Sequence, residues 1–87
     1  MMMDEVEDRA RAVLHMALGV DERYLTPQAR LVDQLYADSM ELLEMVMGLN
    51  EAFGIEIRAE DVAAIDTVAD VYAAVRRLLG ARVEHGV

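Results

Sequence analysis

Residues 38–54 read DSMELLEMVMGLNEAFG, and this stretch predicts the clearest helix of the chain. Asp38 and Glu41 have the spacing of a capping box, in which each satisfies the other's backbone N–H, and Gly54 is a typical residue for ending a helix. At 100° per residue, five apolar side chains gather on one face of this helix: Leu42, Met45, Val46, Leu49 and Phe53. We expect that face to be buried in a core.

The opposite face of the same helix combines methionines with carboxylates. It consists of Met40, Glu44, Met47 and Glu51. Methionine is flexible and polarisable, which suits a surface that must fit several partners. Glutamates beside it favour basic partners through electrostatic complementarity. The pattern therefore indicates a docking surface, although a solvated face with two isolated methionines remains an equally good interpretation, because single exposed apolar residues are common.

Three further helices are predicted around this one. The first covers 4–18, with Asp4 and Glu7 as a capping box, after a frayed start at 1–3 and before Gly19. A short helix at 60–65 turns Val62 and Ile65 inward, and a last helix at 68–79 follows a Thr67–Asp70 capping box and ends at Gly80. The connection 20–37 is long and semi-ordered, with one helical turn at 27–30.

The predicted fold is all-α: a small bundle of four helices, one of them short, with a long loop between the first two. Eighty-seven residues make a single domain, 1–87, with an ordered core at about 4–80.

The composition excludes several functional classes. Eight basic and seventeen acidic residues give a net charge of −9, which argues against nucleic acid and anionic membrane surfaces as partners. No apolar stretch is long enough for stable membrane insertion. The absence of cysteine excludes thiolate chemistry and is compatible with a cytoplasmic location. His15 and His85 belong to no triad or metal-ligand pattern, so we expect no enzyme active site and no metal site.

Ser39 follows the predicted N-cap, and taken alone its role is hydrogen bonding in the first helical turn. The residues around Ser39 indicate a different role. Residues 35–40, LYADSM, resemble the Leu-Gly-Ala-Asp-Ser-Leu signature of acyl carrier proteins. The resemblance continues through Glu44, Phe53 and 56–57 to Thr67, and spans about 6–79.

This resemblance implies that Ser39, preceded by Asp38, is the attachment point of phosphopantetheine, which a phosphopantetheinyl transferase adds from coenzyme A. Acyl groups would be held on the arm as thioesters and presented to acyl-transferring and chain-extending enzymes with basic docking patches. The chain itself would be a monomeric carrier and not an enzyme. The core beside Ser39 could accept an acyl chain. The candidate lining residues, for which ordinary core packing is an equally good interpretation, are Leu42, Val46, Leu49, Phe53, Ile57 and Ile65.

Six positions depart from the family's usual pattern, among them Met40 in place of the usual Leu and Gly48 inside the second helix. Tyr36 stands where Gly is usual, Arg58 where Pro is frequent, and Asn50 and Ala52 at outer positions where fatty-acid carriers often place acids. Together they suggest a specialised carrier for an unusual lipid, polyketide or long-chain product. The alternative function is an acidic helical adaptor that binds a basic partner without any cofactor.

Overall fold

The computed structural model describes residues 3–85, with the side chains of residues 5–81. Four α-helices and one short 3₁₀-helix account for most of this range, and no β-strand occurs in it. The elements are α1 (Met3–Leu18), η1 (Glu22–Tyr24), α2 (Ser39–Phe53), α3 (Ala59–Ala63) and α4 (Val68–His85). The predicted all-α fold with a long loop between its first two main helices is confirmed.

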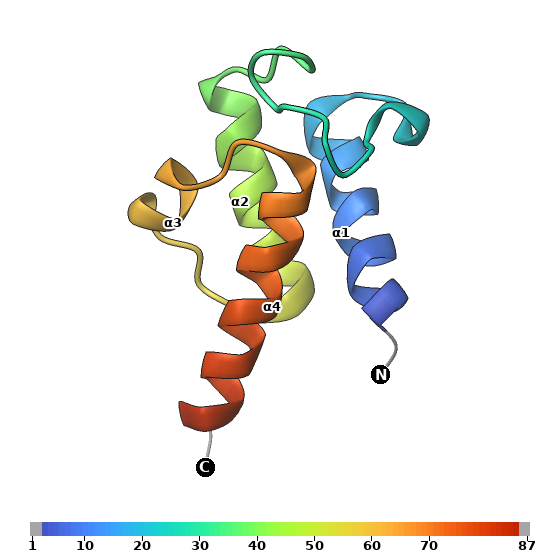
Figure 1. Cartoon of the computed structure of the whole chain (residues 1–87). Helices are drawn as coiled ribbons and strands as arrows, with labels where there is room; N and C mark the ends of the chain where they lie inside the picture. The colour runs from blue at the N-terminus through green and yellow to red at the C-terminus, as the bar shows by residue number, and fades with distance from the viewer. Residues whose placement is uncertain (1–2, 86–87) are drawn as a thin grey trace.

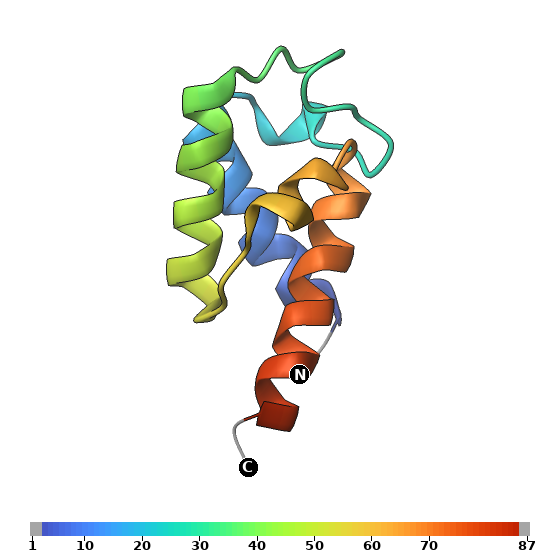
Figure 2. The ribbon, with the colours of Figure 1, turned by 90° about the vertical axis from the view of Figure 1, so that its left-hand side faces the viewer.

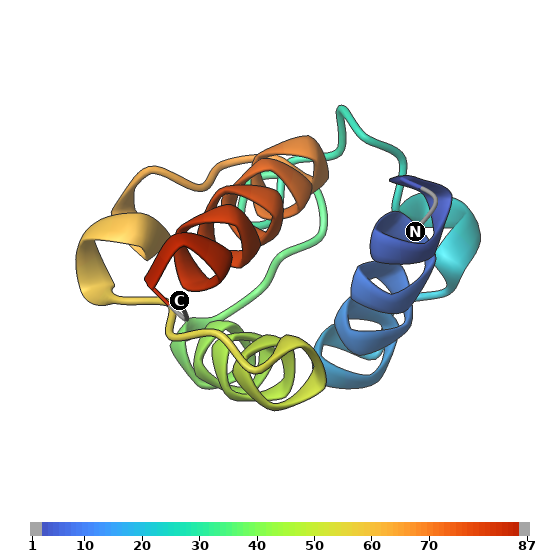
Figure 3. The ribbon, with the colours of Figure 1, turned by 90° about the horizontal axis from the view of Figure 1, so that it is seen from below.

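The three long helices surround the core, and the loop between α1 and α2 covers one end of the bundle (Figure 1). Viewed along the bundle, α1, α2 and α4 form the corners of a triangle (Figure 3). In the view of Figure 2 the short helix α3 lies between α2 and α4. The start of α2 therefore lies at the loop end of the bundle.

The core is built from the apolar faces of the three long helices and from the loop. Met45 and Leu49 of α2 are completely buried, and Phe53 is nearly so, as the helical periodicity predicts. Leu42 and Val46 are half-buried and pack against this core. The other side chains with an exposed fraction of 2% or less are Ala10, Leu14, Leu25, Leu31, Val68, Val71 and Val75.

Two helix starts match the predicted capping boxes. In α2 the Asp38 Oδ1 accepts the Glu41 N–H at 2.8 Å, and Glu41 Oε1 accepts the Asp38 N–H at 3.3 Å. At α4 the Asp70 carboxylate accepts the Thr67 N–H at 3.0 Å, while the Thr67 hydroxyl accepts the Asp70 N–H at 3.2 Å. Gly54 ends α2 in the left-handed conformation, with φ 64°.

Other predicted boundaries were wrong. Met3 is already helical, so Asp4 does not cap α1 from outside, while residues 1–2 lie outside the described residues. Helix α3 begins and ends earlier than predicted, at Ala59–Ala63. Gly80 does not end α4, which continues to His85, because good helix formers follow it and an internal glycine costs only about 1 kcal/mol.

The loop is more ordered than its sequence suggests, because backbone hydrogen bonds join it to the start of α4. The Leu31 N–H donates to the Asp66 carbonyl at 2.9 Å, and the Val68 N–H donates to the Ala29 carbonyl at 3.0 Å. The helical turn predicted at 27–30 is instead η1, and Pro27 occupies a simple turn. The loop is thus held in place beside the residues that lead into α2.

Candidate functional site

Ser39 is the first residue of α2, and its side chain is exposed. It is also the only serine of the chain. The capping box formed by Asp38 and Glu41 fixes the helix start at this point, so the serine has one defined backbone position. Helix geometry leaves the N–H groups of Ser39 and Met40 without an intrahelical acceptor. A phosphate bonded to the Ser39 oxygen would therefore lie beside backbone donors and the positive end of the helix dipole.

Ser39 opens onto a hollow of about 470 Å³ between α2 and α3. Most of its lining is apolar, and the residues are Ser39, Leu42, Leu43, Val46, Ile57, Arg58, Ala59 and Val62. The structure separates the candidate acyl-pocket residues into those that line this hollow and those that do not. Leu42, Val46 and Ile57 line the hollow, whereas Leu49 and Phe53 belong to the closed core and Ile65 packs elsewhere against it. Periodicity alone does not separate these groups, because all six positions are apolar and point inward.

The sequence reasoning missed four lining residues of this hollow: Leu43, Arg58, Ala59 and Val62. Leu43 lies on the flank of α2 between its buried and outer faces, and it is 54% exposed. Arg58 contributes the one positive charge of the hollow. Helix α3 forms the opposite wall and is tied to α4 by the ion pair between Arg77 and Asp61, at 2.6 Å. Asp61 also accepts the Arg58 N–H at 2.9 Å. Both contacts lower the pKa of the Asp61 carboxyl, and the hydrogen bond from the Arg58 backbone has the larger effect.

Comparisons with known proteins agree with this geometry. Residues 8–75 match the family model described as a phosphopantetheine attachment site. The chain belongs to the acyl carrier protein family. It is 51% identical over 55 residues to an acyl carrier protein of Syntrophobacter fumaroxidans, covering 63% of this chain and 68% of the relative. It is 34% identical over 77 residues to that of Thermotoga maritima, covering 88% and 95%.

A solved structure from Mycobacterium tuberculosis, assigned as an acyl carrier protein, has the same fold. The TM-score is 0.76 at 35% identity, covering 83% of this chain and 96% of the other. The predicted family and the predicted non-enzymatic carrier role are thereby confirmed. The phosphopantetheine-binding domain of acyl carrier proteins holds that group covalently, so the predicted cofactor is confirmed too. When bound, the group supplies the thiol that this cysteine-free carrier lacks.

The proposed docking face of the carrier is exposed along α2. Met40 and Met47 are 66% and 61% exposed, and Glu44 and Glu51 are also exposed. Both glutamates border a shallow groove of about 360 Å³ between α1 and α2, which also includes the exposed Met16. Methionine side chains and carboxylates are therefore available together on one side of the molecule.

Gly48 allows α1 and α2 to approach closely at this groove. A Cβ atom at position 48 would lie 2.8 Å from Val13 Cγ1, closer than side chains normally pack. The glycine that weakens the helix locally is thus required by the packing between the two helices.

Tyr36 has an unusual conformation three residues before the serine. Its φ is 61°, and it is the one non-glycine residue with positive φ in the described part of the chain. The left-handed backbone lets the Ala37 N–H return to the Leu31 carbonyl at 2.9 Å. The ring is 81% exposed, so core packing does not explain the tyrosine.

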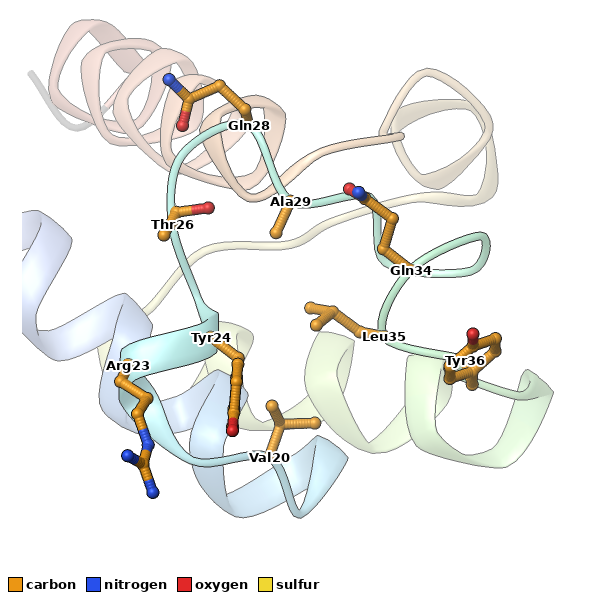
Figure 4. A pocket seen from close by; sticks show the side chains of 9 residues that line it. All are labelled: Val20, Arg23, Tyr24, Thr26, Gln28, Ala29, Gln34, Leu35 and Tyr36. Atoms are coloured by element: carbon orange, nitrogen blue, oxygen red, sulfur yellow. The ribbon is translucent and has the colours of Figure 1, made fainter.

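The Tyr36 ring lies at the edge of a second hollow, of about 550 Å³, formed by the loop (Figure 4). Val20, Ala29 and Leu35 supply its apolar lining, and Arg23 and Tyr24 lie next to Val20. This hollow is larger than the one at Ser39, but Ser39 does not line it.

Asn50 and Ala52 are not outer surface positions, contrary to the prediction. The Asn50 Oδ1 accepts the Ile57 N–H at 2.8 Å and so fixes the connection from α2 to α3. Ala52 packs against the core, and its carbonyl accepts a hydrogen bond from Arg9 at 2.8 Å. Neither residue is therefore evidence that the docking surface of this carrier is less acidic than that of fatty-acid carriers.

The described part of the chain has neither a metal-ligand cluster nor a membrane-spanning helix. Among its residues, no group of three or more His, Cys, Asp or Glu side chains could hold a metal ion. None of the described helices is long and apolar enough to cross a membrane. His15 is exposed, and its Nδ1 donates to the Val20 carbonyl at 2.7 Å. His85 ends α4.

Proposed function

We propose that this protein holds acyl intermediates as thioesters on a phosphopantetheine arm attached to Ser39. The observation that supports this most strongly is the position of the serine: exposed at the first residue of α2, with one side open to an apolar hollow. The only other aliphatic hydroxyls belong to Thr26 and Thr67. Thr67 is already part of the α4 capping box, which leaves Ser39 best placed for a transferase.

The hollow beside Ser39 suits the alkyl part of an acyl group. Leu42, Val46, Ile57 and Val62 offer apolar walls on both α2 and α3. Each buried methylene contributes about 0.8 kcal/mol of favourable transfer free energy. A chain placed there would be shielded from water until a partner enzyme withdraws it.

The carrier presents its cargo to enzymes of fatty acid, specialised lipid or polyketide biosynthesis. These partners include acyl-transferring and chain-extending enzymes, and they dock through basic patches onto Met40, Glu44, Met47 and Glu51. The exposure of all four residues and the absence of any basic residue from α2 support this assignment. We place the protein in the cytoplasm and expect it to act as a monomer.

The loading test uses purified chain, coenzyme A, Mg²⁺ and a broad-specificity phosphopantetheinyl transferase. Intact mass should show one added arm on the wild type and none on Ser39→Ala. A Thr26→Val variant is the matched control and should load like the wild type. A wild type that stays unmodified, or a Ser39→Ala variant that is modified, would contradict the assignment and favour an acidic adaptor without cofactor.

A further inference from the structure

Attachment of the arm introduces a phosphodiester anion into a strongly acidic part of the chain. Residues 33–61 contain eight acidic residues and one arginine, a net charge of −7 out of −9. Two of the carboxylates, those of Asp38 and Glu41, form the capping box at the attachment point itself. The helix dipole offsets only part of this repulsion, because a helix end corresponds to about half a unit charge.

Arg58 is the one cation of this region, and it lines the same hollow as Ser39. Its backbone N–H is fixed by Asp61 at 2.9 Å, while its side chain is 64% exposed. Its ion pair with Glu56 is long, at 3.6 Å between nitrogen and oxygen, and both partners are exposed. Such pairs contribute about 0–1 kcal/mol, so the guanidinium can exchange this partner for a better one.

We propose that Arg58 contacts the phosphodiester of the loaded carrier and directs the arm into the hollow between α2 and α3. A guanidinium presents a planar pair of N–H donors that matches two phosphate oxygens. The contact would hold the arm at the mouth of the hollow, with apolar walls beyond it for the acyl chain. This inference rests on the proposed attachment at Ser39.

Arg23 provides a matched comparison on the other hollow. It is also an exposed arginine with one long carboxylate contact, to Asp21 at 3.5 Å, and it lines the loop hollow of Figure 4. The two hollows offer alternative resting places for the arm, because Tyr36 lines one and Ser39 lines the other. Arg58→Gln and Arg23→Gln therefore remove equivalent charges from the two alternatives.

The experiment loads wild type, Arg58→Gln and Arg23→Gln to completion and confirms each by intact mass. Phosphorus NMR at low salt should show a phosphodiester resonance that shifts in Arg58→Gln and coincides with the wild type in Arg23→Gln. The Arg58 side-chain nitrogen resonances should also shift when the wild type is loaded. These differences should disappear at about 1 M salt, where the Debye length is only about 3 Å.

Melting temperatures give an independent readout. Loading should lower the Tm by about 1–5 °C more in Arg58→Gln than in the wild type, whereas Arg23→Gln should match the wild type. Complete loading with an unchanged phosphorus resonance and no difference in Tm would overturn the role of Arg58 and leave the proposed function intact. A phosphorus shift confined to Arg23→Gln would place the arm in the loop hollow instead. A chain that does not load at all would refute the proposed function.

Discussion

Replacing Tyr36 with glycine should stabilise the protein. A non-glycine residue in the left-handed region costs about 1–2 kcal/mol, which glycine avoids. Glycine loses about 0.5–1 kcal/mol of this gain through the greater entropy of the unfolded chain. The ring is 81% exposed, so its removal sacrifices little burial. The net gain of about 0.7 kcal/mol corresponds to a Tm about 3–6 °C higher in a domain of this size.

Tyr36→Ala separates the effect of the backbone conformation on stability from the effect of the aromatic ring. Alanine keeps the Cβ and therefore the strain at φ 61°, so its Tm should stay within about 2 °C of the wild type. Thermal unfolding of the three proteins, followed by circular dichroism, measures the effect. A Tyr36→Gly variant no more stable than Tyr36→Ala would refute the assignment of strain to this backbone position.

The same two variants test what the strained tyrosine does. The ring lies three residues from Ser39, so the two Cα atoms are within about 11 Å of each other. We expect it to obstruct enzymes of housekeeping fatty acid synthesis, since a steric obstacle to the wrong partner is a common source of specificity. Turnover by a malonyl transferase and a ketosynthase should rise in both variants. If both stay as slow as the wild type, the ring is not the obstacle. A wild type that already matches a housekeeping carrier would remove the evidence for specialisation.

Four other substitutions test the packing, the pH dependence and the docking face. Gly48→Ala should lower stability by about 1 kcal/mol net, because overpacking of its Cβ against the stiff Val13 side chain costs about 1–3 kcal/mol and removal of an interior glycine regains about 0.5–1 kcal/mol. Gly80→Ala has open space around it and should raise stability by about 0.5–1 kcal/mol. Urea unfolding measures both. Backbone N–H donors lower the pKa of the Asp70 carboxyl below its ordinary value of 3.8. The ionised carboxylate therefore contributes its full stabilisation of the folded state above that value, and this contribution is lost as the pH falls through the folded-state pKa. The Tm of Asp70→Asn should fall less than that of the wild type between about pH 5 and pH 3, and equal falls would contradict this. Glu44→Lys should slow acyl transfer by partner enzymes without changing Tm, and unchanged rates would remove Glu44 from the docking surface.

Local sequence information was sufficient wherever the determinants of structure were local. The start of α2 depends on Asp38 and Glu41, three residues apart, and its end on Gly54. The buried face of α2 follows from helical periodicity, which fixed Met45 and Leu49 in the core. The serine position and the acidic outer face of α2 follow from the same helix, so the main elements of the candidate site could be predicted as well.

Predictions were wrong or incomplete where distant parts of the chain decide the structure. The loop is ordered by hydrogen bonds to residues 66–69, which no window of the loop's own sequence contains. The role of Asn50 depends on the Ile57 N–H, which only the folded connection brings within 2.8 Å. The hollow at Ser39 needs α3 as its second wall, so Arg58 and Leu43 could not be assigned to it from α2 alone.

The departures from the family pattern consequently have different physical causes. Asn50 is explained by a hydrogen bond that holds the fold, and Gly48 by the close approach of α1. Tyr36 and Arg58 have no comparable structural role: one is strained and exposed, and the other is weakly paired and exposed. A residue that costs stability, or adds almost none, is a better candidate for a functional role than one that the packing requires. Both lie beside the serine, Tyr36 on the loop side and Arg58 across the hollow. We therefore expect the features that distinguish this carrier from other family members to lie around its attachment point rather than along the outer face of α2.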